Sequence, residues 1–157
     1  MKGPKMKPNK ISLSDFTAAY IECAMWANLM MYRCEHGENA YECEECDPDE
    51  IEPELASADA SPGEYDDSLT DSAREQIERD CRDFVASNIF DLMACGLSPE
   101  QCGHDFALTR NRHGAGFWDR KSRGAVADAA LDRLTEASHA HGTQDFIVAR
   151  DGSVEIA

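Results

Sequence analysis

The sequence predicts an α+β domain that is mainly α, with about four helices and a small antiparallel β-hairpin at the C-terminus. Apolar residues recur at spacings of three and four in several segments, which is the period of one helical face. Near the C-terminus, two short alternating runs flank Asp151-Gly152, a pair typical of tight hairpin turns. A length of 157 residues suits one domain. Because a two-stranded hairpin is marginal by itself, we expect it to pack against the helices.

The first helix is expected over residues 13–32, behind a flexible basic arm at residues 1–11. Its apolar face is formed by residues at helical spacing and by two neighbours that widen it: Leu13, Phe16, Tyr20, Cys23, Ala27, Met30, Trp26 and Met31. No apolar run in the chain approaches the roughly 18 residues that a membrane span needs. The arm is not followed by the apolar stretch of a secretory signal, so the sequence favours a cytosolic chain.

A second helix is expected within residues 70–96, packed antiparallel against the first. Ser72 and Glu75 fit a capping box at its start, and Gly96 fits the position just after its end. Its inward face is expected to hold Ile77, Cys81, Phe84, Val85, Asn88, Ile89, Leu92 and Met93.

Two further helices are expected, joined by a loop. The first covers about residues 99–110, with Ser98 as N-cap and Pro99 at the first helical position, although Gly103 weakens it. The second begins at residue 125 and is stopped by Gly142. Its inward face is expected to hold Val126, Ala130, Leu131, Leu134 and Ala137.

Negative charge is concentrated in one region of the chain. The formal net charge is −16, but residues 35–100 hold 21 acids and three arginines, a net of −18, whereas the rest of the chain is net +2. A potential of this kind repels nucleic acid and attracts basic surfaces. It therefore disfavours direct DNA binding by this region and favours a partner protein with a basic, nucleic-acid-binding surface.

The acids are candidate partner contacts. Those on the second helix are Glu75, Glu78, Asp80, Asp83 and Asp91, and residues 34–67 form an acidic, cysteine-rich insertion or loop without helical period. One interpretation is solubility, because a charged face prevents association. The other is mimicry, in which rows of carboxylates imitate phosphates and occupy a basic groove on another protein.

A second candidate site is "GHDFALTRNRHGAGFWDR", residues 103–120. Arginine forks beside glycines suit phosphate or carboxylate, and a histidine can donate to an anion or carry a proton. The candidate contacts are Arg110, Arg112, His113, Trp118 and Arg120. The stretch is also compatible with a protein-contact surface. The favoured interpretation is a structural loop that Phe117 and Trp118 pin to the core.

Seven cysteines in a cytosolic chain favour thiols or a metal site over disulfides. A tetrahedral zinc site is one interpretation, because sulfur and imidazole ligands suit it. Its ligands would be Cys34, His36, Cys43 and Cys46. Their spacing is unusual, so incidental thiols in a loop are the alternative. Cys23, Cys81 and Cys95 are expected to be small buried side chains, whereas Cys102 fits either role.

Residues 103–120, the later "LDRLTEAS" and the Asp-Gly hairpin together resemble a family of small acidic phage and prophage proteins that carry a GHDFxLTRNxHGAGFWDR motif. The stretch "AAYIECAMW" is similar to the first helix of that family. The resemblance covers residues 13–32 and 70–157. It implies a phage accessory role in the host cytoplasm, and the family has no established activity. Ala107 and Arg112 stand where the family commonly has Trp and Gly.

Together these features predict a non-enzymatic inhibitor, because the sequence holds no nucleophile elbow, phosphate loop or HExxH motif. The expected target is a host defence machine that binds nucleic acid, of the CRISPR or restriction type, blocked by DNA mimicry. Three alternatives stay open. One is a small anion- or nucleic-acid-binding module that uses the loop at residues 110–120, another is a zinc-stabilised interaction adaptor, and the third is an enzyme.

Overall fold

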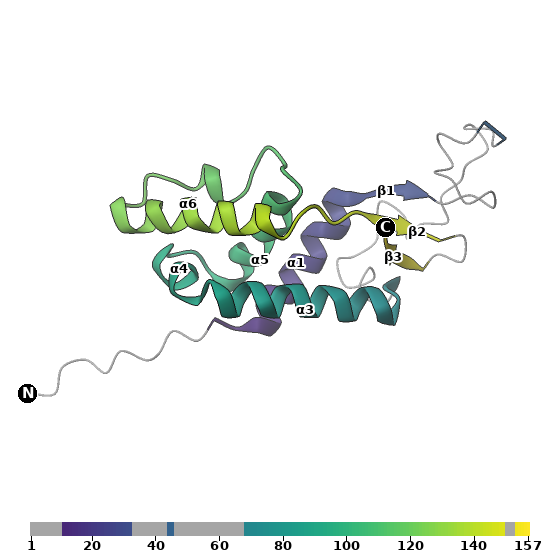
Figure 1. Cartoon of the computed structure of the whole chain (residues 1–157), viewed down its shortest axis with the longest axis horizontal. Helices are drawn as coiled ribbons and strands as arrows, with labels where there is room; N and C mark the ends of the chain where they lie inside the picture. Colours follow the sequence, from purple (N-terminus) through teal and green to yellow (C-terminus); the bar gives the residue numbers. More distant parts are fainter. Residues whose placement is uncertain (1–10, 33–43, 46–67, 150–152) are drawn as a thin grey trace, which may run out of the picture.

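A computed structural model describes residues 11–32, 44–45, 68–149 and 153–157. The elements, labelled in Figure 1, are α1 (Leu13–Asn28), β1 (Leu29–Tyr32), α3 (Asp71–Ser87), α4 (Ile89–Ala94), α5 (Pro99–Arg110), the 3-10 turn η2 (Phe117–Asp119), α6 (Ala125–Ala140), β2 (Phe146–Val148) and β3 (Val154–Ile156). A mainly helical fold with a small C-terminal antiparallel hairpin is therefore confirmed.

The helices enclose the core, and the sheet lies at one end of the molecule. In Figure 1, α3 and α6 run along opposite sides of the view, with α1 and α5 between them. The most extensive contacts of α1 are with α5. In the same view α1 crosses α3 instead of running alongside it. The main partner of the first helix is therefore not the one expected from the sequence.

The sheet has three strands among the described residues, one more than the sequence predicts. β2 pairs antiparallel with β3, as expected for the hairpin, and β1 pairs parallel with β2. The prediction of a helix up to residue 32 is wrong, because α1 ends at Asn28 and the next four residues form β1. Pairing with a strand far along the chain outweighs the local helical spacing. The predicted turn at Asp151-Gly152 lies outside the described residues.

The predicted second helix is two helices, broken at Asn88. Asn88 has φ of −123° and ψ of 21°, and both its backbone N–H and its side-chain amide donate to the Phe84 carbonyl. The side chain thus competes for a backbone acceptor of the helix, as asparagine commonly does. α4 then restarts at Ile89 on a slightly different path.

The sheet fixes where α3 begins. Its N-cap is Thr70, whose hydroxyl accepts from the Ala73 N–H at 3.2 Å, and not the predicted Ser72. The Thr70 N–H in turn donates to the Val154 carbonyl of β3 at 3.0 Å. This long-range bond holds the chain extended up to the cap, so the helix starts immediately after it.

The other helix ends follow the expected turn chemistry. Gly96 after α4 and Gly142 after α6 both have φ of 73°, a conformation that glycine adopts without strain. Ser98 caps α5 by accepting from the Gln101 N–H at 3.1 Å, and Pro99 takes the first helical position. α5 therefore keeps the predicted bounds. Among the described residues, no helix combines the length and the hydropathy that a membrane span requires.

Stacked aromatic rings form the centre of the core. Phe84 of α3 and Phe106 of α5 lie with ring centroids 4.0 Å apart. The Phe16 and Tyr20 rings of α1 are 6.0 and 5.2 Å from that of Phe106, and the Phe117 ring of η2 is 6.2 Å from that of Phe84. Rings at these distances add specific packing to their burial of apolar area. The core thus joins α1, α3, α5 and η2, and apolar side chains of α6 also contribute to it.

Four residues predicted for the core lie largely at the surface. Trp26 of α1 is 81% exposed and Val126 of α6 is 73% exposed. Leu13 and Met93 are also exposed. These side chains lie near the ends of their helices, where the apolar spacing continues beyond the part that packs. The other expected core positions of α1, α3, α4 and α6 are buried or partly buried.

Candidate functional site

Arg110, a predicted partner contact, lies inside the protein. Its side chain is 4% exposed. Nη1 donates to the Tyr20 hydroxyl and to Asp80 Oδ2, both at 3.0 Å, Nε donates to the Gly142 carbonyl at 2.9 Å, and Nη2 donates to the His141 carbonyl at 3.2 Å. These bonds join α1, α3, α5 and the segment after α6. Arg110 is therefore a cross-link of the fold, with its donors directed inward.

Gln144 completes this buried network. Its side-chain oxygen accepts from the Tyr20 hydroxyl at 2.6 Å, and its amide nitrogen donates to Asp80 at 3.3 Å. Its backbone N–H and carbonyl both pair with the Asn111 side chain, at 2.7 and 2.8 Å. Burial raises the pKa of Tyr20, so its hydroxyl stays protonated and can donate. Asn111 and Gln144 could not be predicted from the sequence as members of this network, because each finds its partner only after the chain has folded.

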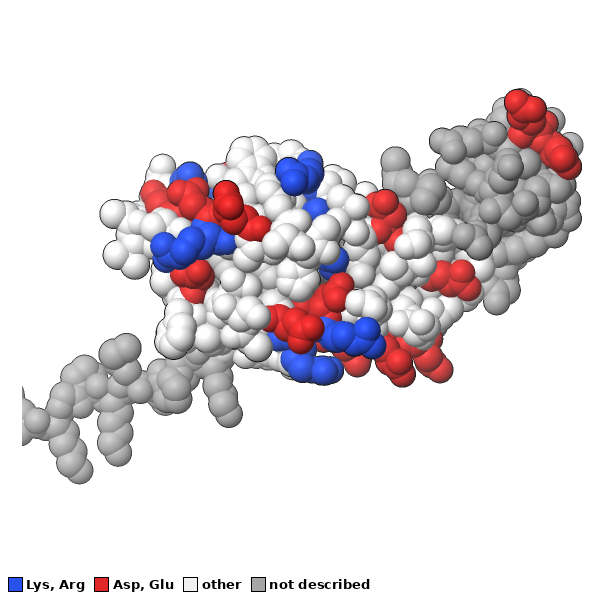
Figure 2. Space-filling model, in the orientation of Figure 1, with Lys and Arg blue, Asp and Glu red and all other residues white. Residues whose placement is uncertain are grey.

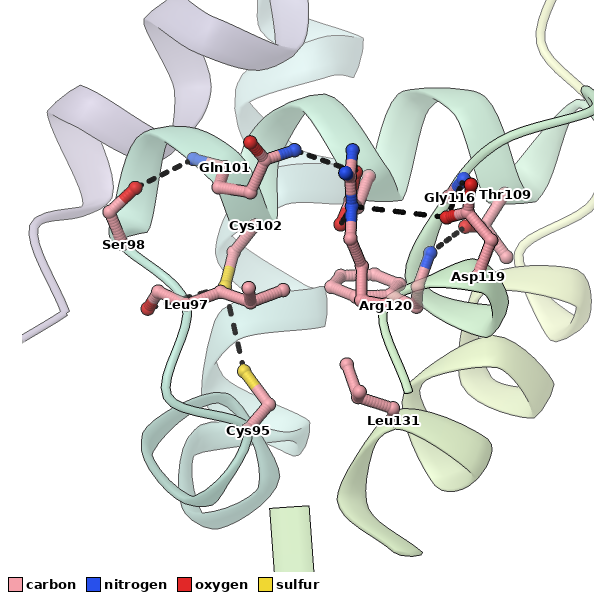
Figure 3. A network of polar contacts seen from close by, with 12 residues as sticks. Cys95, Leu97, Ser98, Gln101, Cys102, Thr109, Gly116, Asp119, Arg120 and Leu131 are labelled. Atoms are coloured by element: carbon pink, nitrogen blue, oxygen red, sulfur yellow. Dashed lines mark hydrogen bonds and ion pairs between the residues drawn. The ribbon is translucent and has the colours of Figure 1, made fainter. Parts of the chain in front are cut away.

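A second polar cluster links α5 to the end of η2 (Figure 3). Asp105 is fully buried and accepts from Nε and Nη2 of Arg120, both at 3.1 Å, and from the Gln101 side-chain amide at 2.9 Å. Asp119 closes η2 by accepting from the Gly116 N–H at 3.1 Å. The hydrogen bond to Asp105 raises the pKa of Arg120, which stays charged and paired. Arg120 therefore neutralises a buried acid of the fold.

Close packing explains two glycines of residues 103–120. A Cβ added at Gly103 would lie 2.1 Å from the Phe16 carbonyl oxygen of α1, and one at Gly116 would lie 2.2 Å from Thr109 Oγ1. Gly116 also has φ of 149°, which side-chain-bearing residues rarely adopt. Gly114 differs, because nothing lies within 4 Å of such an atom there. The glycine pattern thus reflects helix packing and a tight return, not a phosphate-binding loop.

The surface that this stretch presents is small. Arg112 is exposed with φ of 57°, and no described acid forms an ion pair with its guanidinium. Trp118 is 45% exposed, so Phe117 alone of the two predicted anchors is buried. His113 is half-buried, and its N–H donates to the Leu108 carbonyl at 3.0 Å. Arg110 is buried, and Arg120, whose side chain is 35% exposed, pairs with Asp105, so Arg112 alone of the three predicted arginines is both exposed and without a described acid as partner.

Two acids predicted for the partner surface pair with arginines of this chain, one in the interior and one at the surface. The Asp80 side chain is 15% exposed and pairs with Arg110. Asp91 is 21% exposed and accepts from Nε and Nη2 of Arg133, which links α4 to α6. Asp80 therefore serves the buried network, whereas the role of Asp91 as a partner contact stays a prediction.

Three predicted acids stay exposed on α3: Glu75, Glu78 and Asp83. α3 also carries three arginines among its five acids, so its net charge is only −2. Figure 2 shows acidic and basic side chains intermixed on the visible face of the described residues. α3 alone is therefore not an uninterrupted acidic row. Residues 33–67 hold far more charge, with 14 acids, one arginine and no lysine.

The predicted zinc ligands Cys34, His36, Cys43 and Cys46 lie outside the described residues. Within the described ranges, no group of three or more His, Cys, Asp or Glu side chains is placed to hold a metal ion. The described cysteines are buried free thiols, namely Cys23, Cys81, Cys95 and Cys102. Burial is therefore confirmed for the first three, and Cys102 joins them.

Comparisons with protein-family models, with curated proteins and with solved structures found no match for this chain. The geometry defines a small helical domain in which two arginines of residues 103–120 are structural. Its candidate functional surface therefore consists of exposed acids and the few exposed residues around Arg112.

We expect Arg112→Gly to leave the fold intact. A side-chain-bearing residue in the left-handed region costs about 1 kcal/mol, which glycine avoids. Glycine also loses roughly 0.5–1 kcal/mol more conformational entropy on folding, so the two effects nearly cancel. The free energy of unfolding in urea should therefore change by less than about 1 kcal/mol. A loss above about 2 kcal/mol would contradict the exposed position of Arg112.

We also expect the stability of the fold to fall as the pH drops below about 6.5, in part because of His141. Its ring packs edge-on against Phe84 and Phe106, with centroids 5.7 and 5.3 Å away. Burial and then the nearby charge of Arg110 lower the pKa of His141, although neighbouring acids act the other way. The unfolded chain then binds the proton more readily. The contribution of neutral His141 to the free energy of unfolding is therefore complete above the pKa that this histidine has in the unfolded chain. It is lost as the pH falls toward the lower pKa of His141 in the folded chain.

Urea unfolding of wild type and His141→Gln between about pH 5 and about pH 7.5 measures that contribution. The variant should lose less stability than wild type on acidification. Parallel pH profiles for the two proteins would show that His141 does not contribute.

Proposed function

We propose that this chain is a phage-encoded inhibitor that binds the basic, nucleic-acid-binding surface of a host defence protein, of the CRISPR or restriction type, through its acids. One observation carries the proposal: residues 33–67 hold 14 acids, one arginine and no lysine. This charge attracts a basic groove and repels nucleic acid, so the target is the protein and not the DNA. Carboxylates in such a groove replace phosphates as partners of its lysines and arginines.

The fold supports this proposal by holding both flanks of the acidic segment at one sheet. Before the segment, β1 ends at Tyr32 and pairs with β2. After it, Leu69 forms a bridge with Val154 of β3. The first two turns of α3 follow immediately and add the exposed acids Asp71 and Glu75. The described residues on either side of the segment therefore lie at the same sheet.

The arginines of residues 103–120 support the proposal by elimination. A small anion-binding module would need unpaired arginines at the surface, but Arg110 is buried against Asp80, and the partly exposed Arg120 pairs with the buried Asp105. Arg112 keeps one exposed charge, which does not balance the acids. Long-range attraction to a basic partner therefore outweighs attraction to an anion.

Capture from a host lysate on the immobilised chain tests the proposal. Wild type is compared with a neutralised variant, in which the acids of residues 33–67 become Asn and Gln, and with Arg112→Gln. Wild type and Arg112→Gln should retain the same nucleic-acid-binding protein, and added salt or duplex DNA should release it. The neutralised variant should lose it.

Folding of the neutralised variant is checked by circular dichroism. Capture that survives neutralisation, or that duplex DNA does not compete away, would overturn the proposal.

A further inference from the structure

Two buried cysteines lie in contact at the turn between α4 and α5. The sulfur atoms of Cys95 and Cys102 are 3.9 Å apart, and Figure 3 shows them pointing toward each other. Neither residue is exposed. Cys95 caps the end of α4 and Cys102 is the fourth residue of α5, so the pair spans a short connection.

The turn holds the two sulfurs as neighbours. Gly96 takes the left-handed conformation that ends α4, and Ser98 caps α5 two residues later. The Cys95 thiol also contacts the Leu92 carbonyl at 3.2 Å, and the Arg123 guanidinium donates to the Gly96 carbonyl at 3.2 Å. Because both helix ends are fixed in this way, the folded structure sets the short distance between the two sulfur atoms.

The two thiols are chemically different. The hydrogen bond with Cys102 lowers the pKa of Cys95 below that of an ordinary thiol, against the effect of burial. The same contact and burial raise the pKa of Cys102. The thiolate is the reactive form of cysteine, so Cys95 is the attacking member of the pair.

The other two described cysteines serve as internal comparisons. Burial raises the pKa of Cys23 to about 11 and that of Cys81 to about 12. Within the described residues, neither forms a sulfur–sulfur hydrogen bond such as the one between Cys95 and Cys102. Burial therefore disfavours the reactive thiolate at Cys23 and Cys81. The sulfur–sulfur contact distinguishes Cys95 and Cys102 from these two buried thiols.

We propose that Cys95 and Cys102 form a redox-active pair that closes into a disulfide when the folded chain meets hydrogen peroxide. The Cys95 thiolate attacks one peroxide oxygen and the O–O bond breaks. Cys95 becomes a sulfenic acid, and the departing hydroxide takes up the proton that Cys95 lost and leaves as water.

In the second step, the sulfur of Cys102 attacks the sulfur of Cys95. The S–O bond breaks, and the hydroxyl group leaves as a second water with the Cys102 proton. Two thiols and one peroxide thus give one disulfide and two waters. A disulfide bond is about 2.05 Å long, so the sulfurs have to approach by about 2 Å, a movement on the scale of a side-chain rotation.

Peptide mapping tests the proposal, because trypsin leaves Cys95 and Cys102 in one peptide and puts each of the other two described cysteines in a different peptide. Residues 83–110 form one tryptic peptide that holds Cys95 and Cys102 and no other cysteine, whereas Cys23 and Cys81 fall in residues 11–33 and 80–82. Folded wild type is treated with peroxide, unfolded, alkylated and digested. We expect the 83–110 peptide without alkyl groups and about 2 Da lighter than its reduced form, reversed by dithiothreitol. The other two peptides should stay alkylated.

Variants separate the two steps. Cys102→Ser should give no such peptide and should leave a Cys95 sulfenic acid that dimedone traps, whereas Cys81→Ser should behave as wild type. Protein unfolded in urea before peroxide should lose the preference for this pair. A fully alkylated 83–110 peptide, with other cysteines oxidised, would overturn the proposal. Should Cys102→Ser fail to fold, the wild-type map decides alone.

Discussion

Arg110→Met is expected to lower the free energy of unfolding by about 3 kcal/mol, near the lower end of the cost of breaking a buried ion pair. Methionine keeps an apolar stem beside Phe106, whose ring centre lies 5.3 Å from the guanidinium carbon. It removes every donor of the arginine, so Asp80 keeps the side-chain amides of Gln76, at 2.8 Å, and Gln144, at 3.3 Å, but no cationic partner. Because the Asp80 side chain is 15% exposed, water relieves part of the loss. Urea unfolding followed by circular dichroism measures the change.

Arg133→Met is the matched control, since it breaks another Arg–Asp pair in which the arginine side chain is 60% exposed. Exposed pairs contribute within about 1 kcal/mol, so this variant should be nearly as stable as wild type. Adding Asp80→Asn to Arg110→Met removes the stranded charge and should recover part of the stability. Similar small losses for Arg110→Met and Arg133→Met would contradict the structural role of Arg110.

Gly103→Ala is expected to destabilise the fold by about 2 kcal/mol or more, the cost of overpacking a filled contact. Alanine favours a helix interior over glycine by about 1 kcal/mol, so helix propensity alone predicts the opposite sign. Packing should win, because the new Cβ would lie 2.1 Å from the Phe16 carbonyl oxygen and 3.1 Å from the Tyr20 nitrogen. Both are backbone atoms of α1, which cannot move without shifting that helix.

Gly114→Ala is the control for Gly103→Ala. It lies in the same stretch of sequence, it is exposed, and nothing lies within 4 Å of the added atom. Its effect should be neutral or stabilising by up to about 1 kcal/mol, through the unfolded chain. Equal effects of the two substitutions in thermal unfolding would show that α1 and α5 do not meet as closely as described.

The sequence could predict those parts of the fold that local chemistry determines. α5 has the predicted bounds because Ser98 and Pro99 specify its start within a few residues. The strand β1 was missed, since its partner β2 is recognised only after the chain has folded. The break at Asn88 was missed for the opposite reason. Apolar spacing continues smoothly across it, and only the bonds to the Phe84 carbonyl reveal it.

The candidate site was also only partly predictable, because its residues depend on partners that are distant in the chain. An arginine beside glycines predicts an anion site or an internal brace equally well, and its partner decides between them. Arg110 bonds to Asp80 and Tyr20, which are 30 and 90 residues away in the chain. Asp105 was the available signal, because it occupies a position between apolar neighbours on α5 and a buried acid requires a cationic partner.

The pairing of Arg110 and Arg120 with acids of the fold changes what the stretch at residues 103–120 can indicate. Most of its residues serve helix packing and the internal bonds of the fold, namely Gly103, Asp105, Arg110, Gly116, Phe117 and Arg120. We therefore infer that similarity in this stretch indicates a common fold and does not by itself indicate a common ligand. Activity would then be determined by charge outside the stretch, above all by residues 33–67.

The affinity of the captured partner for three chains tests most directly whether the acids of residues 33–67, and not the arginine loop, bind the partner. Calorimetry at several salt concentrations would compare wild type, Arg112→Gln and the chain with neutral residues 33–67. We expect Arg112→Gln to bind like wild type and the neutralised chain to bind at least about 100-fold more weakly, with a flatter salt dependence. Unchanged affinity of the neutralised chain, together with a large loss for Arg112→Gln, would contradict an acidic interface and favour the arginine loop.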